Sequence, residues 1–139
     1  MEPSSQASTD PTSPSKAMLW VGWIVSAIPV VMLTMSGIMK LMKPAPVVEG
    51  FEHLGWPISL ALALGIVELV CTVIYVIPRT AVLGAILLTG YLGGAIATHV
   101  RIGEVFIGPA VFGMLVWLGL YLRDPRIRDL LPLREVRSS

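Results

Sequence analysis

Glu68 is the residue of this sequence most suited to chemistry, because it lies inside an otherwise uncharged apolar stretch from Leu54 to Pro78. An ionised carboxylate at the centre of a bilayer costs at least about 2.5–3.5 kcal/mol. Glu68 must therefore be protonated, paired with a cation or hydrated. Ionisable groups inside membrane segments are by default candidates for function.

Candidate partners for this carboxylate lie at the ends of the neighbouring apolar stretches. Lys40 ends the first stretch and His99 ends the third, so both side chains can reach toward Glu68 from the same side of the membrane. Ser36 lies one helical turn deeper on the face of Lys40, and Thr98 precedes His99. We therefore expect an outward-opening polar pocket, suited to a proton relay or to binding a polar head group. The alternative is a Glu68–Lys40 ion pair that only sets how the helices pack.

Four long apolar stretches must position these side chains, and each is long enough to cross a bilayer, which takes about 18–20 residues. The expected helices cover residues 18–41, 57–77, 81–99 and 108–121. A shorter helix at 47–56 combines Val48, Phe51 and Leu54 with charged neighbours, which is typical of a segment at the membrane surface. The predicted fold class is all-α: a polytopic bundle of four transmembrane helices, with a short interfacial helix between the first and the second.

The two ends of the chain differ in character from this hydrophobic region. Residues 1–17 are rich in Ser, Thr and Pro and have no apolar periodicity, so we expect a disordered tail. Residues 18–122 are expected to form the four-helix transmembrane domain. Residues 123–139 are basic and are expected to form a cytoplasmic C-terminal tail.

The overall composition favours a membrane protein and excludes several other classes. Hydrophobic residues make up 55% of the 139 residues and charged residues 14%, whereas a soluble domain carries about a quarter charged residues. The net charge of +1 argues against a nucleic-acid partner, which would require a basic face. A single cysteine, Cys71, excludes an internal disulfide and a CxxC redox pair. The sequence has no metal-binding motif, so no metal site is predicted.

Lysines and arginines are unevenly divided between the two sides of the predicted bundle. Four crossings place both termini on one side. That side holds Lys16, Arg79, Arg123, Arg126, Arg128, Arg134 and Arg137, and the other side holds Lys40, Lys43 and Arg101. Because cytoplasmic loops carry the excess of positive charge, this division predicts a multi-pass protein of the cytoplasmic (inner) membrane with both termini in the cytoplasm.

Small residues indicate where helices of this bundle pack closely. Gly90 and Gly94 form a GxxxG pair in the third long helix, and Gly65 lies about one turn before Glu68 in the second. Such residues let helix backbones approach one another in lipid. The Gly90/Gly94 pair can serve packing within a single bundle or the assembly of a homo-oligomer, and the sequence leaves both interpretations open.

The order of these features resembles a known family. The segments that carry the resemblance are SGIMKL at 36–41, FEHLGWP at 51–57, GIVEL at 65–69, PRTAVLGA at 78–85 and GGAIATH at 93–99. Over residues 18–134 the chain is similar to the DoxX-like family of small four-helix bacterial membrane proteins. The resemblance implies a bundle in the cytoplasmic membrane associated with redox biology. Distant members include a subunit of a thiosulfate:quinone oxidoreductase and a membrane partner of secreted antioxidant and sulfur-transfer enzymes.

The resemblance supplies no catalytic residues, so the roles of Lys40, Glu68 and His99 rest on membrane physics. We expect a membrane subunit or anchor that supports a redox system, has redox proteins as partners and binds a quinone head group in its pocket. Glu68 would exchange a proton while Lys40 and His99 hydrogen-bond the carbonyl oxygens. One alternative is a small-solute permease or channel, which would need a dimer because four helices without an inverted repeat make a poor lone transporter. The other is a structural scaffold without chemistry of its own.

Overall fold

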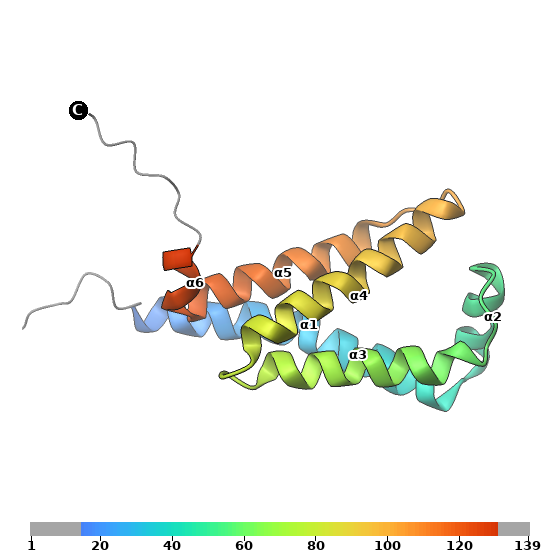
Figure 1. Ribbon diagram of the computed structural model, residues 1–139, viewed down its shortest axis with the longest axis horizontal. Coiled ribbons are helices and arrows are strands. Elements are labelled where there is room, and N and C mark those ends of the chain that lie inside the picture. The colour runs from blue at the N-terminus through green and yellow to red at the C-terminus, as the bar shows by residue number, and fades with distance from the viewer. Residues whose placement is uncertain (1–14, 131–139) are drawn as a thin grey trace, which may run out of the picture.

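The computed structural model describes residues 15–130, and these residues form six helices. The four long helices run alongside one another: α1 (Lys16–Met42), α3 (Leu60–Val76), α4 (Ala81–Arg101) and α5 (Ile107–Arg123) (Figure 1). Two shorter helices, α2 (Ala45–His53) and α6 (Pro125–Leu130), lie at opposite ends of the bundle. The long helices contact each other as a closed ring in the order α1, α3, α4, α5. The predicted all-α bundle is confirmed.

The observed helix ends differ from the predicted ones for local reasons. Helix α1 begins earlier than expected because the Ser15 side chain caps it, accepting a hydrogen bond from the Met18 backbone N–H at 3.2 Å. Pro44 stands at the N-cap of α2, so that helix also begins earlier. Helix α6 was not predicted and lies in the segment expected to be a basic tail. The remaining parts of the two predicted tails, 1–14 and 131–139, lie outside the described residues.

The four long helices are unequal in length. Helices α1 and α4 have 27 and 21 residues and are long and apolar enough to cross a membrane. Helices α3 and α5 are apolar but have 17 residues each, which corresponds to about 25 Å of helix. That length is at the lower limit for crossing a hydrocarbon core of about 30 Å. The bundle therefore combines two long and two shorter apolar helices.

The outer surface of the bundle is apolar, while polar groups lie inside. Large apolar side chains point outward from all four long helices; Met35 on α1 and Ile86 on α4, for example, are 62% and 55% exposed. The buried polar residues are Ser26, Glu68 and Thr72. Soluble monomers rarely expose a continuous apolar surface of this extent. In lipid such a surface costs nothing, because the hydrocarbon tails are as apolar as the side chains.

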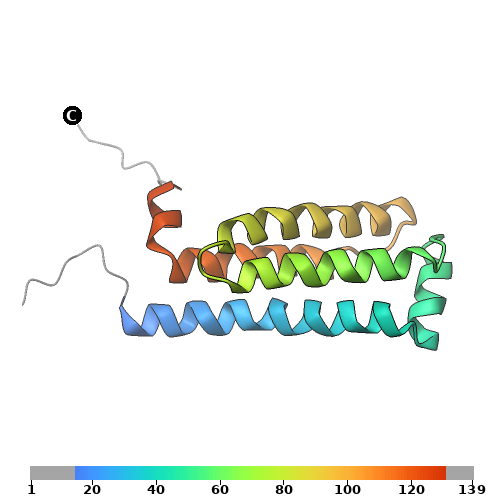
Figure 2. The same ribbon diagram turned by 60° about the horizontal axis from the view of Figure 1, so that its bottom comes forward.

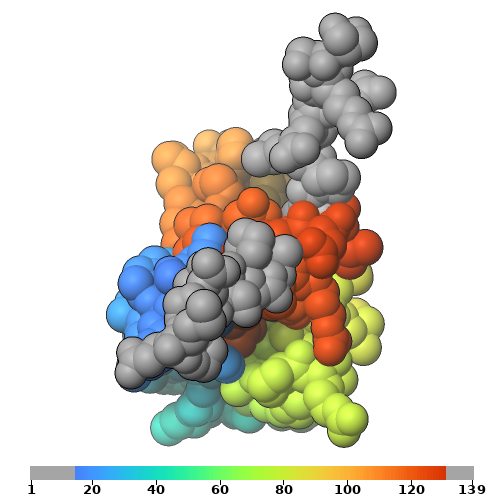
Figure 3. Space-filling view, turned by 90° about the vertical axis from the view of Figure 1, so that its left-hand side faces the viewer, coloured from blue at the N-terminus to red at the C-terminus, as the bar shows by residue number. Residues whose placement is uncertain are grey.

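A dense core fills the half of the bundle that contains the start of α1 and the turn between α3 and α4. Tyr75, Leu88, Val116 and Leu120 are almost completely buried there. The Tyr75 hydroxyl is 2.8 Å from the Val116 carbonyl oxygen, to which it donates. Figure 3 shows this end of the molecule, where the start of α1, the α3–α4 turn and α6 lie together. The tight packing closes this half of the bundle.

The other half of the bundle is more open. Figure 1 shows α4 and α5 leaning away from α1 and α3 toward the end that carries α2. In Figure 2, α2 lies crosswise to the long helices at that end. The predicted short helix between the first two long helices is thus present, and it lies beside the opening.

Candidate functional site

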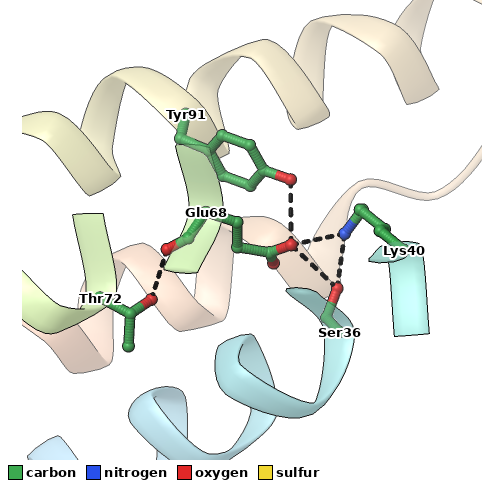
Figure 4. A network of polar contacts seen from close by, with 5 residues as sticks. All are labelled: Ser36, Lys40, Glu68, Thr72 and Tyr91. Carbon is green, nitrogen blue, oxygen red and sulfur yellow. Dashed lines mark hydrogen bonds and ion pairs between the residues drawn. The ribbon is translucent and has the colours of Figure 1, made fainter. Parts of the chain in front are cut away.

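The Glu68 carboxylate is the centre of a polar network at the inner wall of the open half (Figure 4). Three side chains donate hydrogen bonds to the same oxygen, Oε2: Lys40 from Nζ at 2.6 Å, Tyr91 from its hydroxyl at 3.2 Å and Ser36 from its hydroxyl at 3.3 Å. The Lys40 contact is also an ion pair. Helices α1, α3 and α4 therefore meet at one carboxylate oxygen.

A close approach of two helices brings this network together. Ser36 and Lys40 are four residues apart on α1, so they share one face, and Lys40 Nζ donates to Ser36 Oγ at 2.6 Å. Between them, Gly37 faces Gly65 of α3. A Cβ atom at Gly65 would lie only 2.9 Å from the Gly37 carbonyl oxygen. The absence of side chains at these two positions lets α1 reach Glu68, one turn further along α3.

Burial makes the pairing of Glu68 energetically necessary. Glu68 is 2% exposed and the Lys40 side chain 19% exposed. Removing two charges from water costs several kcal/mol for each ion, and their attraction offsets this only when further hydrogen bonds satisfy the remaining groups. The hydroxyl groups of Ser36 and Tyr91 supply those additional bonds. The buried carboxylate therefore has one basic partner and two further hydrogen-bond donors inside the apolar bundle.

A cavity of about 550 Å³ adjoins this network. All four long helices, α2 and the α2–α3 connection contribute to its wall, which is mostly apolar. The polar or ionisable side chains in the wall are Ser36, Lys40, Trp56, Glu68, Tyr91, Thr98 and His99. Small-molecule sites in proteins have volumes of about 300–1,000 Å³ and combine an apolar wall with a few polar groups. The cavity has both properties.

The residues predicted for the pocket all line this cavity, but they do not all bond to Glu68. His99 and Thr98 each form a hydrogen bond within α4 instead: His99 Nδ1 lies 2.8 Å from the Ala95 carbonyl oxygen, and Thr98 Oγ1 donates to the Gly94 carbonyl oxygen at 2.9 Å. Ser36 and Lys40 bond directly to the carboxylate. His99 is thus part of the cavity wall and is not bonded to the Lys40–Glu68 ion pair.

The glycines singled out in the sequence take different positions. Gly65 lies at the α1–α3 contact. Gly90 and Gly94 line the cavity, and a Cβ atom at either position would meet no atom within 4 Å. Because they carry no side chains, these two residues leave the α4 side of the cavity open.

Tyr91 is the site residue that the sequence analysis did not identify. Its hydroxyl donates to Glu68 Oε2, and its ring lies beside the Lys40 ammonium, 6.0 Å from Nζ to the ring centroid. The sequence does contain a pattern that points to Tyr91, because this residue lies about two helical turns before His99 and so lies on a similar face of α4. A tyrosine hydroxyl in an apolar helix needs a partner just as a carboxylate does.

The open end of the cavity is bridged by polar contacts between segments distant in sequence. Arg101 at the end of α4 donates to the Leu54 carbonyl oxygen and stacks near the Trp56 ring, 5.6 Å from the ring centroid. His53 of α2 contacts Glu104 in the α4–α5 loop. These contacts attach α2 and the α2–α3 connection to the end of α4, next to the cavity.

Comparison with known families agrees with the fold. The family model described as DoxX-like matches residues 24–119, which include the whole network around Glu68. The chain belongs to the DoxX-like family. No curated protein and no solved structure matches it. The apolar helices of this DoxX-like protein and its family together indicate a membrane protein.

The chemistry open to this DoxX-like protein follows from the groups that its cavity presents. Within residues 15–130 no cluster of three or more His, Cys, Asp or Glu side chains could hold a metal ion. Cys71 is buried and unpaired. The cavity instead offers an ammonium group, a carboxylate, a phenol and an imidazole to a ligand. Such a set can bind a polar head group and exchange protons with it.

Proposed function

We propose that this protein is a membrane subunit or anchor of a quinone-linked redox system, and that its cavity holds the quinone head group. The observation that carries the proposal is the apolar chamber with the Lys40–Glu68 pair in its wall. A quinone is a lipid-soluble ring with polar oxygens, so it needs an apolar chamber with a few polar contacts. The volume of about 550 Å³ suits a substituted ring of this kind.

Each polar residue of the cavity wall would have a separate role in binding. Lys40 carries three N–H donors, and two of them are used on Glu68 and Ser36. The third is free to bond a ligand oxygen, since Lys40 lines the cavity. Glu68 would accept or give a proton at the same place, with its charge balanced by Lys40. Redox proteins outside this chain would be the partners that supply or remove electrons.

The extent of the cavity favours binding over conduction. Its lining residues on α1 begin at Met32, and those on α3 and α5 extend no further than Glu68 and Phe112. The remaining half of the bundle is filled by the core around Tyr75 and Leu120. A chamber closed at one end is suited to holding a ligand. A path for solute through a single bundle would have to cross that core, so we rank a permease below the quinone-linked subunit.

Bound quinone is the test of this proposal. We expect protein purified in mild detergent to carry quinone, detectable by chromatography of an organic extract. Glu68→Gln should weaken the binding of added quinone at least about tenfold, because Lys40, the donor to a quinone oxygen, loses the charged partner that holds its ammonium group at the cavity wall. Glu52→Gln on the exposed side of α2 is the matched control and should have no effect. Wild-type protein that neither carries nor binds a quinone would refute the proposal and favour a structural scaffold.

A further inference from the structure

The hydrogen bond of His99 determines what this residue presents to the cavity. Its Nδ1 lies 2.8 Å from the Ala95 carbonyl oxygen. A carbonyl oxygen can only accept, so Nδ1 must be the nitrogen that carries the proton in this contact. In the neutral ring the other nitrogen, Nε2, then has a free lone pair and acts as an acceptor. Since His99 lines the cavity, it offers a ligand an acceptor.

Glu68 presents a second acceptor. Lys40, Ser36 and Tyr91 all donate to Oε2. Within residues 15–130 no hydrogen bond reaches the other oxygen, Oε1. A carboxylate oxygen without a partner at a buried site retains strong acceptor capacity. Tyr91 presents a further acceptor, because its only hydroxyl proton is donated to Oε2 and the lone pairs of its oxygen remain.

Acceptors therefore outnumber donors in the cavity wall. The donors that remain are one N–H of Lys40 and the indole N–H of Trp56. His99, Glu68 and Tyr91 contribute lone pairs. The two carbonyl oxygens of a quinone can only accept hydrogen bonds, so they can pair with these donors but leave every acceptor of the site unpaired. The two hydroxyl groups of a quinol can each donate one.

We propose that the cavity selects the reduced form of its ligand, an aromatic ring with hydroxyl donors, over the oxidised quinone. This inference rests on the proposed function. One hydroxyl would donate to Glu68 Oε1 and the other toward His99 Nε2, while Lys40 donates to a hydroxyl oxygen. His99 is then a ligand-binding residue that accepts, in contrast to the carbonyl-donating role expected from the sequence.

Binding of the two forms of one molecule tests the inference. Decylubiquinol and decylubiquinone would be compared by equilibrium dialysis under anaerobic conditions against the full chain in detergent. We expect the quinol to bind about tenfold more tightly or better, the effect of roughly one well-formed hydrogen bond to a charged or buried acceptor. His99→Leu should remove most of this preference, and His99→Gln, which keeps an acceptor oxygen, should retain part of it.

Two control variants separate this effect from general disturbance of the protein. Thr34→Val changes a residue that does not line the cavity and whose hydroxyl is bonded to its own helix, and His53→Leu removes a histidine that does not line the cavity. Both should keep the quinol preference. Equal or tighter binding of the quinone by the wild type would overturn the inference and leave the proposed function standing. Binding of neither form would overturn both.

Discussion

At the scale of single residues, the Lys40–Glu68 pair is the feature with the largest energetic consequence. The carboxylate is 2% exposed, and the Lys40 ammonium lies 2.6 Å from its Oε2. Taken alone, such a pair contributes little net stability, because desolvation offsets the attraction. Removing only one partner is costly, since the other charge stays buried. This asymmetry gives a clear prediction.

We expect Lys40→Met to destabilise the protein by about 3 kcal/mol, at the lower end of the range for broken buried pairs because Lys40 is partly exposed. Replacing both residues, with Lys40→Met and Glu68→Leu, should restore stability to within about 1 kcal/mol of the wild type. Thermal and denaturant unfolding in detergent would measure both differences. If Lys40→Met alone were as stable as the wild type, the buried carboxylate would not need Lys40 to compensate the cost of its burial.

The double variant also separates function from packing. If the pair serves only to set how the helices pack, the folded double variant should be fully active in any assay that the wild type passes. If the pair binds a head group, the double variant should fold and yet fail to bind quinone.

At the scale of elements, the contact between α1 and α3 positions the site. Gly37 and Gly65 face each other there, and neighbouring atoms occupy the space in which side chains would lie. Ser36 and Lys40 reach Glu68 only because the two backbones approach so closely. The glycines of α4 behave differently, because Gly90 and Gly94 face open space.

Substitution of these two kinds of glycine should have opposite effects. In Gly65→Ala the new methyl group would lie 2.9 Å from the Gly37 carbonyl oxygen and 3.0 Å from Lys40 Cβ, so we expect a loss of about 1–3 kcal/mol of unfolding free energy through overpacking. Gly90→Ala meets nothing within 4 Å, so it should be neutral or stabilise by up to about 1 kcal/mol through helix propensity. Unfolding in detergent compares the two. Equal effects would contradict the packing described for α1 and α3.

At the scale of the whole molecule, orientation in the membrane decides which compartment the cavity faces. The start of α1, the α3–α4 turn and α6 lie at one end of the bundle (Figure 3), and α2 lies at the other. The division of lysines and arginines predicts that the first end is cytoplasmic. The cavity would then open toward the outer side, near α2.

Cysteine labelling tests this orientation in a Cys71→Ser background. Glu49 on α2 and Asp129 on α6 are exposed, and acidic residues contribute little to topology, so each can be replaced by cysteine. We expect a membrane-impermeant maleimide to label Glu49→Cys in intact cells and Asp129→Cys only after permeabilisation. The reverse pattern would place the termini outside and the cavity toward the cytoplasm.

Much of the fold could be predicted from the sequence because lipid imposes a simple rule on it. A chain segment in hydrocarbon must satisfy its backbone hydrogen bonds within itself, so long apolar stretches must be helices. The four long helices and the short one after the first follow from this rule together with proline positions. The exact ends of the helices and the presence of α6 were harder to predict from the sequence. They depend on caps such as Ser15 and on contacts that involve only a few residues.

The candidate site was predictable only in part, and the reason is geometric. A buried carboxylate needs a cation, and Lys40 was the nearest one at a suitable depth, so hydropathy and spacing alone pointed to their pairing. Which other side chains join the pair depends on helix rotation, which the apolar faces of these helices do not specify. Rotation brought Tyr91 onto the carboxylate and directed the donor nitrogen of His99 to its own helix.

The sequence by itself determined that this chain is a small helical membrane protein with a charge that must be compensated inside it, because both conclusions depend only on the composition along the chain. The tertiary structure alone decided that α4 and α5 diverge from α1 and α3 and that a cavity adjoins the ion pair. Close approach at Gly37 and Gly65 on one side and open space at Gly90 and Gly94 on the other are properties of pairs of helices. They arise from the way in which similar apolar faces fit together, which no single segment encodes.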